Sequence, residues 1–227
     1  MQPTYLPWAG YFNLIEETDA FVFLDDVQFN AQSWQQRNRV VVGGQPHILT
    51  VPVLTKGRSE QKILDVTTDE TKNWRRKHLC TLQQAYAKHP YGKAVVGLVE
   101  EVLAANVTLL AEINIALIRS FCRTMGMSPR FYVSSHFSLS GHKSAHVLAI
   151  CRHLAADSYL SPVGSREYLE EEGLFDACEV KLSYQDYAPT PYPQPGANEF
   201  ISHMSIVDVL ACIGFEEGRR YVERTVS

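Results

Sequence analysis

The sequence lacks the features that mark membrane, secreted and nucleic-acid-binding proteins. No stretch approaches the roughly 20 apolar residues that span a bilayer, and no N-terminal segment has the charged, apolar and small-residue order of a signal peptide. Lys and Arg number 21 against 25 Asp and Glu, which gives a net charge of -4. Because phosphate backbones attract clustered positive charge, we expect neither a membrane span nor a nucleic-acid partner.

Cysteine is scarce and forms no recognisable pattern. The five cysteines are widely spaced and contain no CxxC pair, which excludes the common zinc and redox motifs. His142 and His146 have HxxxH spacing, but the intervening glutamate of the HExxH motif is absent, so no metal site is predicted. An odd cysteine count fits a reducing compartment, and we therefore expect the protein in the cytoplasm.

What is present is the periodicity of one α/β domain over residues 1–227. Helices are predicted over 7–18, 71–86, 94–103, 107–125, from a Ser140 cap to 154, over 167–172 and over 205–213. Strands are predicted over 20–24, 63–66, 130–134, 158–160 and 179–184, with a hairpin of 40–42 and 48–53 around Gly43-Gly44 and a Pro-rich loop over 188–196. The alternation predicts a mostly parallel sheet flanked by helices, Rossmann-like or nucleotidyltransferase-like, with a helical insertion at roughly 70–127.

Five ordered motifs carry a family resemblance. They are QPTYLPWAGYF (2–12), TDAFVFLDDVQF (18–29), SWQQRNRV (33–40), LTVPV (49–53) and YLSPVGSREYL (159–169). With FISHMSIVDVLACIG (200–214), they make the chain resemble the WbqC-like protein family over nearly its whole length. The resemblance implies a role in bacterial surface-polysaccharide biosynthesis without fixing a reaction. It also implies a short apolar strand ahead of Gln2, so the sheet edge beside this segment is the least defined part of the prediction.

The opening segment supplies the first candidate binding residues: Gln2, Tyr5, Trp8 and Tyr11. A strand end, a turn between two prolines and a helix start would gather them around one loop, and helix N-termini bind anions. The loop is distantly similar to the HxGH loop of class I nucleotidyltransferases and pantoate-type ligases, but it lacks both histidines. Trp8 and Tyr11 fit an amphipathic core position as well.

Three charged residues are candidate catalytic groups. Asp25 and Asp26 follow an apolar strand, and one of them is expected to face the site as a base or magnesium ligand, since neighbours on a strand point to opposite faces. Lys143 lies in a first helical turn, where a cation is unfavourable. Its position is consistent with an anion bound at that helix start, although an exposed lysine would fit too.

The remaining candidates come from loops and the resemblance. They are Gln28, Arg37, Asn38, Tyr159, Ser161 and Tyr168. Arginine suits phosphate or carboxylate recognition, yet Arg37 also fits a surface position beside the hairpin. Cys151 lies on the apolar stripe of its helix and is interpreted first as a core residue.

The family resemblance, together with the loop–helix geometry at Gln2, implies an enzyme that transfers or ligates an acyl or aminoacyl group to an amino-sugar, with an amino-sugar, a nucleotide-sugar or an acyl or aminoacyl donor as substrate. ATP or another nucleotide with Mg²⁺ is the candidate cofactor. Two alternatives remain open. One is a non-catalytic carbohydrate- or nucleotide-binding accessory protein of the same pathway, because aromatic loops also suit sugar faces. The other is an acyltransferase that uses Cys151.

Overall fold

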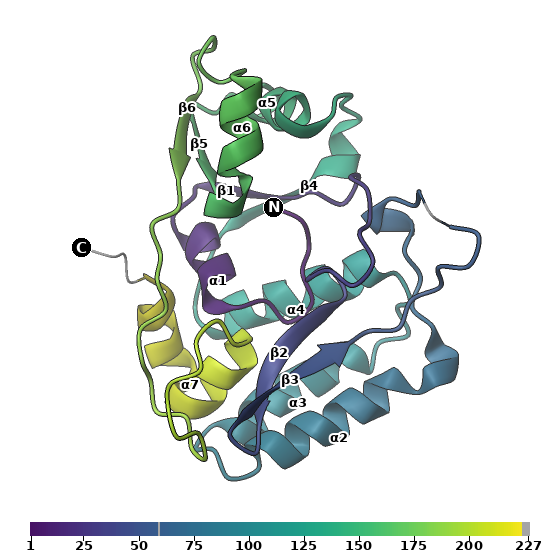
Figure 1. Ribbon diagram of the computed structural model, residues 1–227, viewed down its shortest axis with the longest axis vertical. Coiled ribbons are helices and arrows are strands. Elements are labelled where there is room, and N and C mark those ends of the chain that lie inside the picture. Colours follow the sequence, from purple (N-terminus) through teal and green to yellow (C-terminus); the bar gives the residue numbers. More distant parts are fainter. Residues whose placement is uncertain (59, 224–227) are drawn as a thin grey trace.

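The computed structural model describes residues 1–58 and 60–223, and it has a mixed α/β architecture (Figure 1). The α-helices are α1 (Ala9–Glu16), α2 (Trp74–Tyr86), α3 (Gly92–Leu103), α4 (Leu110–Thr124), α5 (Lys143–His153), α6 (Arg166–Glu172) and α7 (Ile206–Glu223). The strands are β1 (Ala20–Phe23), β2 (Arg37–Val42), β3 (Gln45–Thr50), β4 (Arg130–Val133), β5 (Ser158–Ser161) and β6 (Lys181–Tyr184). Short 3-10 turns include η1 (Ile63–Asp65) and η3 (Ser134–Phe137).

The strands form three two-stranded sheets rather than the single mostly parallel sheet that the sequence predicts. Strands β1 and β4 pair in parallel, β5 and β6 pair in parallel, and β2 and β3 form an antiparallel hairpin. Alternation of strands and helices correctly indicates parallel pairs, but it does not determine which pairs share hydrogen bonds. The sheets are separate because β1 and β5 face each other across a hollow, described below.

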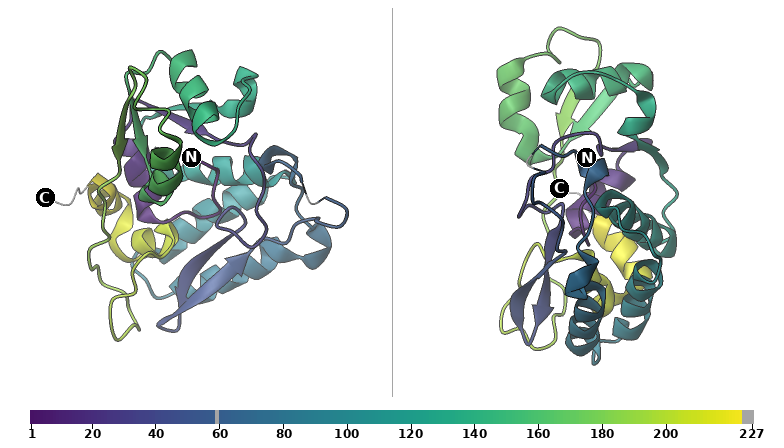
Figure 2. Two further views of the ribbon diagram at one scale, coloured as in Figure 1. Left: turned by 45° about the horizontal axis from the view of Figure 1, so that its top comes forward. Right: turned by 90° about the vertical axis from the view of Figure 1, so that its right-hand side faces the viewer.

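The apolar residues gather in two clusters. The larger joins α1, α2, α3, α4 and α7 with one face of the β1–β4 pair and with the hairpin. The smaller lies beneath α5 and α6 and contains Val147, Leu148, Cys151, Leu169, Phe175 and Val180. Helices α5 and α6 and strands β5 and β6 therefore stand together at one end of the molecule, as Figures 1 and 2 show. The helices between β3 and β4 belong to the larger cluster together with α1 and α7.

Local sequence signals explain most elements. Leu110, Ile113, Leu117 and Phe121 recur at three- and four-residue intervals and are all buried along α4, as their spacing predicts. The predicted hairpin is confirmed, because Gly43 and Gly44 both have positive φ (58° and 75°) and connect β2 directly to β3.

Three local predictions are wrong. Residues 63–65 form η1, and no strand is found over 63–66, since a four-residue apolar run buries equally well in either geometry. Ser140 does not cap α5, whose N-cap is His142 without a side-chain hydrogen bond. Helix α7 also continues past the predicted end at Ile213, across a break at Gly214 (φ 83°). Within residues 1–58 and 60–223, we find no helix long and apolar enough to cross a bilayer.

Candidate active site

The carboxyl ends of β1 and β4 bring polar residues from distant segments together. Asp25 and Asp26 follow β1 after Leu24, and Ser134 and Ser135 come directly after β4. Since the two strands pair in parallel, all four residues leave the sheet at the same edge. The carboxyl edge of parallel strands is where α/β proteins bind ligands.

Asp25 is a buried, fully engaged carboxylate. Its Oδ1 accepts a hydrogen bond from the backbone N–H of Ser135 (3.0 Å) and lies 3.1 Å from Ser134 Oγ, whose single hydroxyl proton it shares with Asp26; its Oδ2 accepts from Ser135 Oγ (2.8 Å). The Asp25 carboxylate therefore binds the polar groups of the first two residues of η3. In this way Asp25 holds the segment that follows β4 against the segment that follows β1, and both of its oxygens are engaged.

Asp26 forms a dyad with a histidine of α5. His146 Nε2 lies 3.1 Å from Asp26 Oδ1, and Ser134 Oγ donates to the same oxygen. The two side chains are only 6% and 13% exposed for His146 and Asp26, respectively. His146 Nδ1 is buried and has no hydrogen-bond partner among the described residues. An unpaired N–H there would be costly, so the favoured tautomer donates from Nε2 to Asp26 and leaves Nδ1 as an empty acceptor.

Both carboxylates contact Ser134, contrary to the expectation that adjacent residues would diverge. That expectation assumed a regular strand, but β1 ends at Phe23 and the chain bends at Asp26. In the part of the chain that the structure describes, Asp26 Oδ2 has no hydrogen-bond partner. It is the carboxylate oxygen of this pair that remains for a substrate proton or a cation.

Lys143 stands one turn before His146, at the start of α5. Its ammonium lies 3.5 Å from Glu172 of α6, and the other Glu172 oxygen accepts from the backbone N–H of Ser144 (3.2 Å). The anion that the sequence led us to expect at this helix start is thus a carboxylate of the protein itself. Lys143 adopts a left-handed backbone conformation (φ 49°) and remains 69% exposed.

The opening segment divides into buried and accessible residues. Tyr5 and Tyr11 are fully buried, where Tyr5 Oη bonds to His78 Nδ1 (2.9 Å) and Tyr11 Oη donates to the Gln2 carbonyl (3.0 Å). Burial raises the pKa of both phenols well above 10. These tyrosines hold the loop rather than line an open site.

Gln2 and Trp8 lie nearer the surface. Gln2 Oε1 accepts from Gln35 Nε2 (2.9 Å), and the Trp8 ring packs against His203 with centroids 4.8 Å apart. Leu24 N donates to the Met1 carbonyl, so Gln2 follows Met1 at the same edge from which Asp25 leaves β1. The opening segment and the carboxylates therefore share one edge.

The motif over residues 33–40 lies beside the opening loop and contributes a hydrogen bond to it. Asn38 is buried and its Nδ2 donates to the Tyr5 carbonyl (3.1 Å). Arg37 lies partly exposed, with Nη1 donating to Gln32 Oε1 (3.0 Å). Gln28 is exposed and forms an isolated antiparallel bridge with Lys62. Asn38 is a structural partner of the loop, whereas Arg37 and Gln28 are accessible.

The third group of predicted residues lies on the β5–β6 side. Tyr159 stacks on Phe175 (5.6 Å, 22°), Tyr168 packs against the smaller cluster, and Ser161 is buried, with Oγ donating to the Pro162 carbonyl (3.3 Å). Tyr159 also borders the hollow between β1 and β5, which has a volume of about 570 Å³. None of the three contacts the Asp26–His146 dyad among the described interactions.

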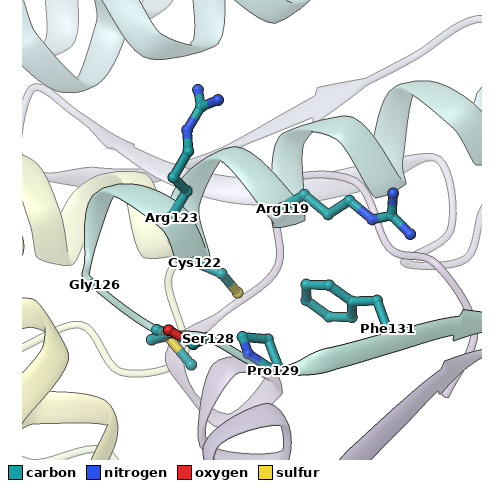
Figure 3. Close-up of a pocket in the computed structure, with 8 residues that line it drawn as sticks. Arg119, Cys122, Arg123, Gly126, Ser128, Pro129 and Phe131 are labelled. Atoms are coloured by element: carbon teal, nitrogen blue, oxygen red, sulfur yellow. The ribbon is translucent and has the colours of Figure 1, made fainter.

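A second hollow, of about 480 Å³, lies beyond the end of α4 (Figure 3). Arg119 extends over the Phe131 ring, Arg123 points away from the hollow, and Cys122 turns its sulfur inward (Figure 3). Burial raises the pKa of the Cys122 thiol to about 12. The hollow offers no acid–base pair, so we place the candidate site at the dyad.

Sequence reasoning missed Ser134, Ser135 and His146. The serines could have been found, because they follow a predicted strand just as the aspartates do. His146 could be considered only with His142, since its actual partner Asp26 lies 120 residues earlier. No periodic pattern in the sequence indicates that His146 contacts Asp26.

Comparisons with known proteins confirm the family resemblance. A family model described as the WbqC-like protein family matches residues 2–220. The chain is 31% identical over 218 residues to a protein of Mycobacterium tuberculosis (strain ATCC 25618 / H37Rv) described as "Uncharacterized protein Rv1507c", covering 95% of this chain and 93% of that relative. No solved structure matches the chain.

Proposed function

Because the chain belongs to the WbqC-like protein family, we propose that it is a cytoplasmic enzyme of bacterial surface-polysaccharide (O-antigen-type) biosynthesis. The proposed reaction transfers an acyl or aminoacyl group, or ligates it, to the amine of an amino-sugar. The amine nitrogen bonds to the carbonyl carbon of an activated donor, and the bond from that carbon to the donor's leaving group breaks. The amine proton must then pass to a base.

The Asp26–His146 dyad is the observation that carries this proposal. Asp26 Oδ2 is the accessible base, while His146 Nε2 and Ser134 Oγ hold Oδ1 and orient the carboxylate. A carboxylate fixed by two donors loses little freedom when it accepts a proton, as general base catalysis requires. Asp25 holds the two serines and thereby the geometry of the dyad.

A nucleotide phosphate with Mg²⁺ is the proposed activating group of the donor. The exposed guanidinium of Arg37 is the group suited to the phosphate, since arginine binds phosphate, whereas Asp26 Oδ2 stays free to accept the amine proton. Lys143 is already paired with Glu172 and would attract an anion only at the rim of the site.

The test begins with calorimetric titration of ATP, CTP and nucleotide-activated amino-sugars, with and without Mg²⁺. The ligands that bind are then incubated with acyl and aminoacyl donors, and mass spectrometry detects the new amide. In Asp26→Asn we expect turnover to fall by about 10²- to 10⁴-fold while the sugar still binds. Asp176→Asn, at an exposed position between α6 and β6, is the matched control and should keep full turnover.

A second candidate function rests on an aromatic surface next to the opening loop. Trp34 is 51% exposed, Arg39 lies over its ring at 5.7 Å, and Arg39 Nη2 donates to the carbonyl of His203, which packs on Trp8. Aromatic faces bordered by arginine suit sugars, which supports a carbohydrate-binding accessory protein. Sugar binding that Trp34→Ala abolishes, without turnover of any donor, would favour this alternative over the enzyme.

A further inference from the structure

A buried glutamine near the carboxyl edge of β1 has a side-chain amide with only one possible orientation. Gln35 is 2% exposed, and its Oε1 accepts a hydrogen bond from the backbone N–H of Asn30 (3.0 Å), while its Nε2 lies 2.9 Å from Gln2 Oε1. The two ends of an amide are easily interchanged in a structure, but a backbone N–H can only donate. Oε1 of Gln35 must therefore face Asn30, and its Nε2 must donate to Gln2.

The orientation of Gln35 determines that of Gln2. Because Gln35 offers a donor, Gln2 turns its Oε1 toward Gln35, and its Nε2 points elsewhere. Among the residues that the structure describes, Gln2 Nε2 has no hydrogen-bond partner, and it is not one of their buried unpaired atoms. Gln2 therefore presents a donor, and not an acceptor, to the solvent.

A buried asparagine of α4 holds both segments in place. Asn114 is fully buried, and its Nδ2 donates to the backbone carbonyls of Pro3 (3.1 Å) and Gln35 (2.8 Å). The residue after Gln2 and the backbone of Gln35 are therefore joined to the same helix residue. Polar groups that a rigid element supports in this way lose little freedom when a ligand binds, so the donor of Gln2 is preorganised.

This donor complements the Asp26–His146 dyad. The dyad offers Asp26 Oδ2 and His146 Nδ1 as acceptors, while its N–H donor, His146 Nε2, is already engaged by Asp26. Acyl transfer also needs a donor, because the carbonyl oxygen gains negative charge as the amine attacks. Gln2 follows Met1, whose carbonyl accepts from Leu24 N. The donor therefore stands at the edge where the carboxylates follow β1.

We propose that Gln35 is a positioning residue, which fixes Gln2 Nε2 as the donor to the carbonyl oxygen of the acyl group. The inference rests on the proposed acyl transfer and adds the group that recognises the acyl donor. A carbonyl oxygen accepts hydrogen bonds and fits this position, whereas an ammonium group only donates and does not. The same oxygen remains in the product as the amide carbonyl, so the two glutamines distinguish an N-acylated amino-sugar from the free amine.

Calorimetry with two nucleotide-sugars that differ only at this group tests the inference. UDP-N-acetylglucosamine carries the carbonyl oxygen, and UDP-glucosamine carries an ammonium group. Gln2→Glu keeps the bond from Gln35 but presents a carboxylate oxygen in place of the donor. We expect the ratio of the two dissociation constants to shift toward the amine by about 100-fold in Gln2→Glu and by about tenfold in Gln2→Met. Gln45→Glu, at an exposed position of β3, is the matched control and should leave the ratio unchanged.

Proton exchange of the side-chain amides, measured by NMR with isotopically labelled glutamine, tests the orientation without any ligand. The Gln35 amide should exchange at least about tenfold more slowly than the Gln2 amide. In Gln35→Glu the carboxylate accepts from both neighbours, so the Gln2 amide should turn round and its exchange should slow. If the buried carboxylate prevents folding, the comparison of the two amides in the unaltered protein still decides.

The outcomes separate this inference from the proposed function. Fast exchange at Gln35, no binding of UDP-N-acetylglucosamine, or an unchanged ratio in Gln2→Glu would overturn the role of the two glutamines. A merely structural role of Gln2 would weaken both probes equally and leave the ratio as it is. Amide formation with an unchanged ratio would leave the proposed function standing alone, whereas a shifted ratio without turnover of any donor would leave the recognition of the carbonyl oxygen without the enzyme.

Discussion

At the scale of single residues, the two adjacent aspartates have different tasks. Asp25 is 5% exposed and both of its carboxylate oxygens have hydrogen-bond partners, whereas Asp26 Oδ2 has none among the residues that the structure describes. We expect Asp25→Asn to lower the free energy of unfolding by about 2–3 kcal/mol, because charge-assisted bonds to buried groups are lost. Asp26→Asn should cost less than half as much. Denaturant titration measures both, and equal losses would contradict this division of tasks.

Cys151 separates the acyltransferase alternative from the proposed mechanism. The thiol borders the hollow, and burial raises its pKa to about 11. The thiolate fraction at pH 7 is then about 10⁻⁴, and only the thiolate is a nucleophile. We expect iodoacetamide to label exposed Cys80 well before Cys151, as followed by peptide mass spectrometry, and Cys151→Ser to keep full activity. Equally fast labelling of both thiols, or loss of turnover in Cys151→Ser, would support the acyltransferase mechanism that uses Cys151.

At the scale of elements, the Pro-rich loop is attached to α7 through a buried carboxylate. Asp208 Oδ2 accepts from Tyr192 Oη (2.6 Å) and Gln194 Nε2 (2.9 Å), and its Oδ1 accepts from Tyr86 Oη (2.9 Å). The nearby Asp208 carboxyl adds to burial in raising the pKa of both phenols well above 10, so the tyrosines remain donors. The loop follows β6 and passes close to Trp8 through Tyr187.

We therefore expect Tyr192→Phe to loosen the loop without unfolding the helices. The loss of one bond to a buried carboxylate should speed hydrogen exchange over residues 188–200 by about tenfold, which corresponds to about 1.4 kcal/mol of local opening. Exchange in α4 should not change, and Tyr168→Phe on α6 is the control. If exchange accelerates equally in α4, the carboxylate supports the whole fold rather than the loop.

Elements were predictable from the sequence where their signal is local, and not where a distant partner decides. The α4 spacing and the Gly43-Gly44 turn depend on neighbours along the chain, and both predictions are confirmed. The start of α5 is different, because the carboxylate that binds there belongs to Glu172, 28 residues beyond Ser144. The same holds for the candidate site, where Asp25 and Asp26 were predicted but the dyad partner His146 was not. Pairing across 120 residues leaves no periodic trace in a single sequence.

At the scale of the whole molecule, the periodicity of the sequence could not predict which strands join into one sheet. Each strand was recognisable on its own, except that residues 63–65 form a 3-10 turn. Yet the parallel pairs β1–β4 and β5–β6 share no ladder within the described residues, and a hollow of about 570 Å³ lies between β1 and β5.

The buried amino group of Met1 gives the whole molecule a pH dependence. In the unfolded chain the amine has a pKa near 8, and in the folded chain burial lowers it to about 5. Between these values the unfolded state binds the additional proton, so stability rises as pH increases from 5 to 8. Three units correspond to roughly 4 kcal/mol as an upper bound. His78, whose pKa burial lowers to about 4, adds a slope of the same sign below pH 6.5.

Acetylation of the amino group separates the two contributions. An acetylated Met1 carries no titrating proton, while His78 is unchanged, so the acetylated chain should show a shallower rise in stability from pH 5 to 8. Denaturant titrations at pH 5, 6, 7 and 8 on both forms measure the difference, which should be greatest at pH 5 and vanish near pH 8. Parallel curves for the two forms would mean that the amine is hydrated and not enclosed between β1 and β5. A difference confined to low pH would show that the enclosed position disfavours a charge, as the interior of a sheet does.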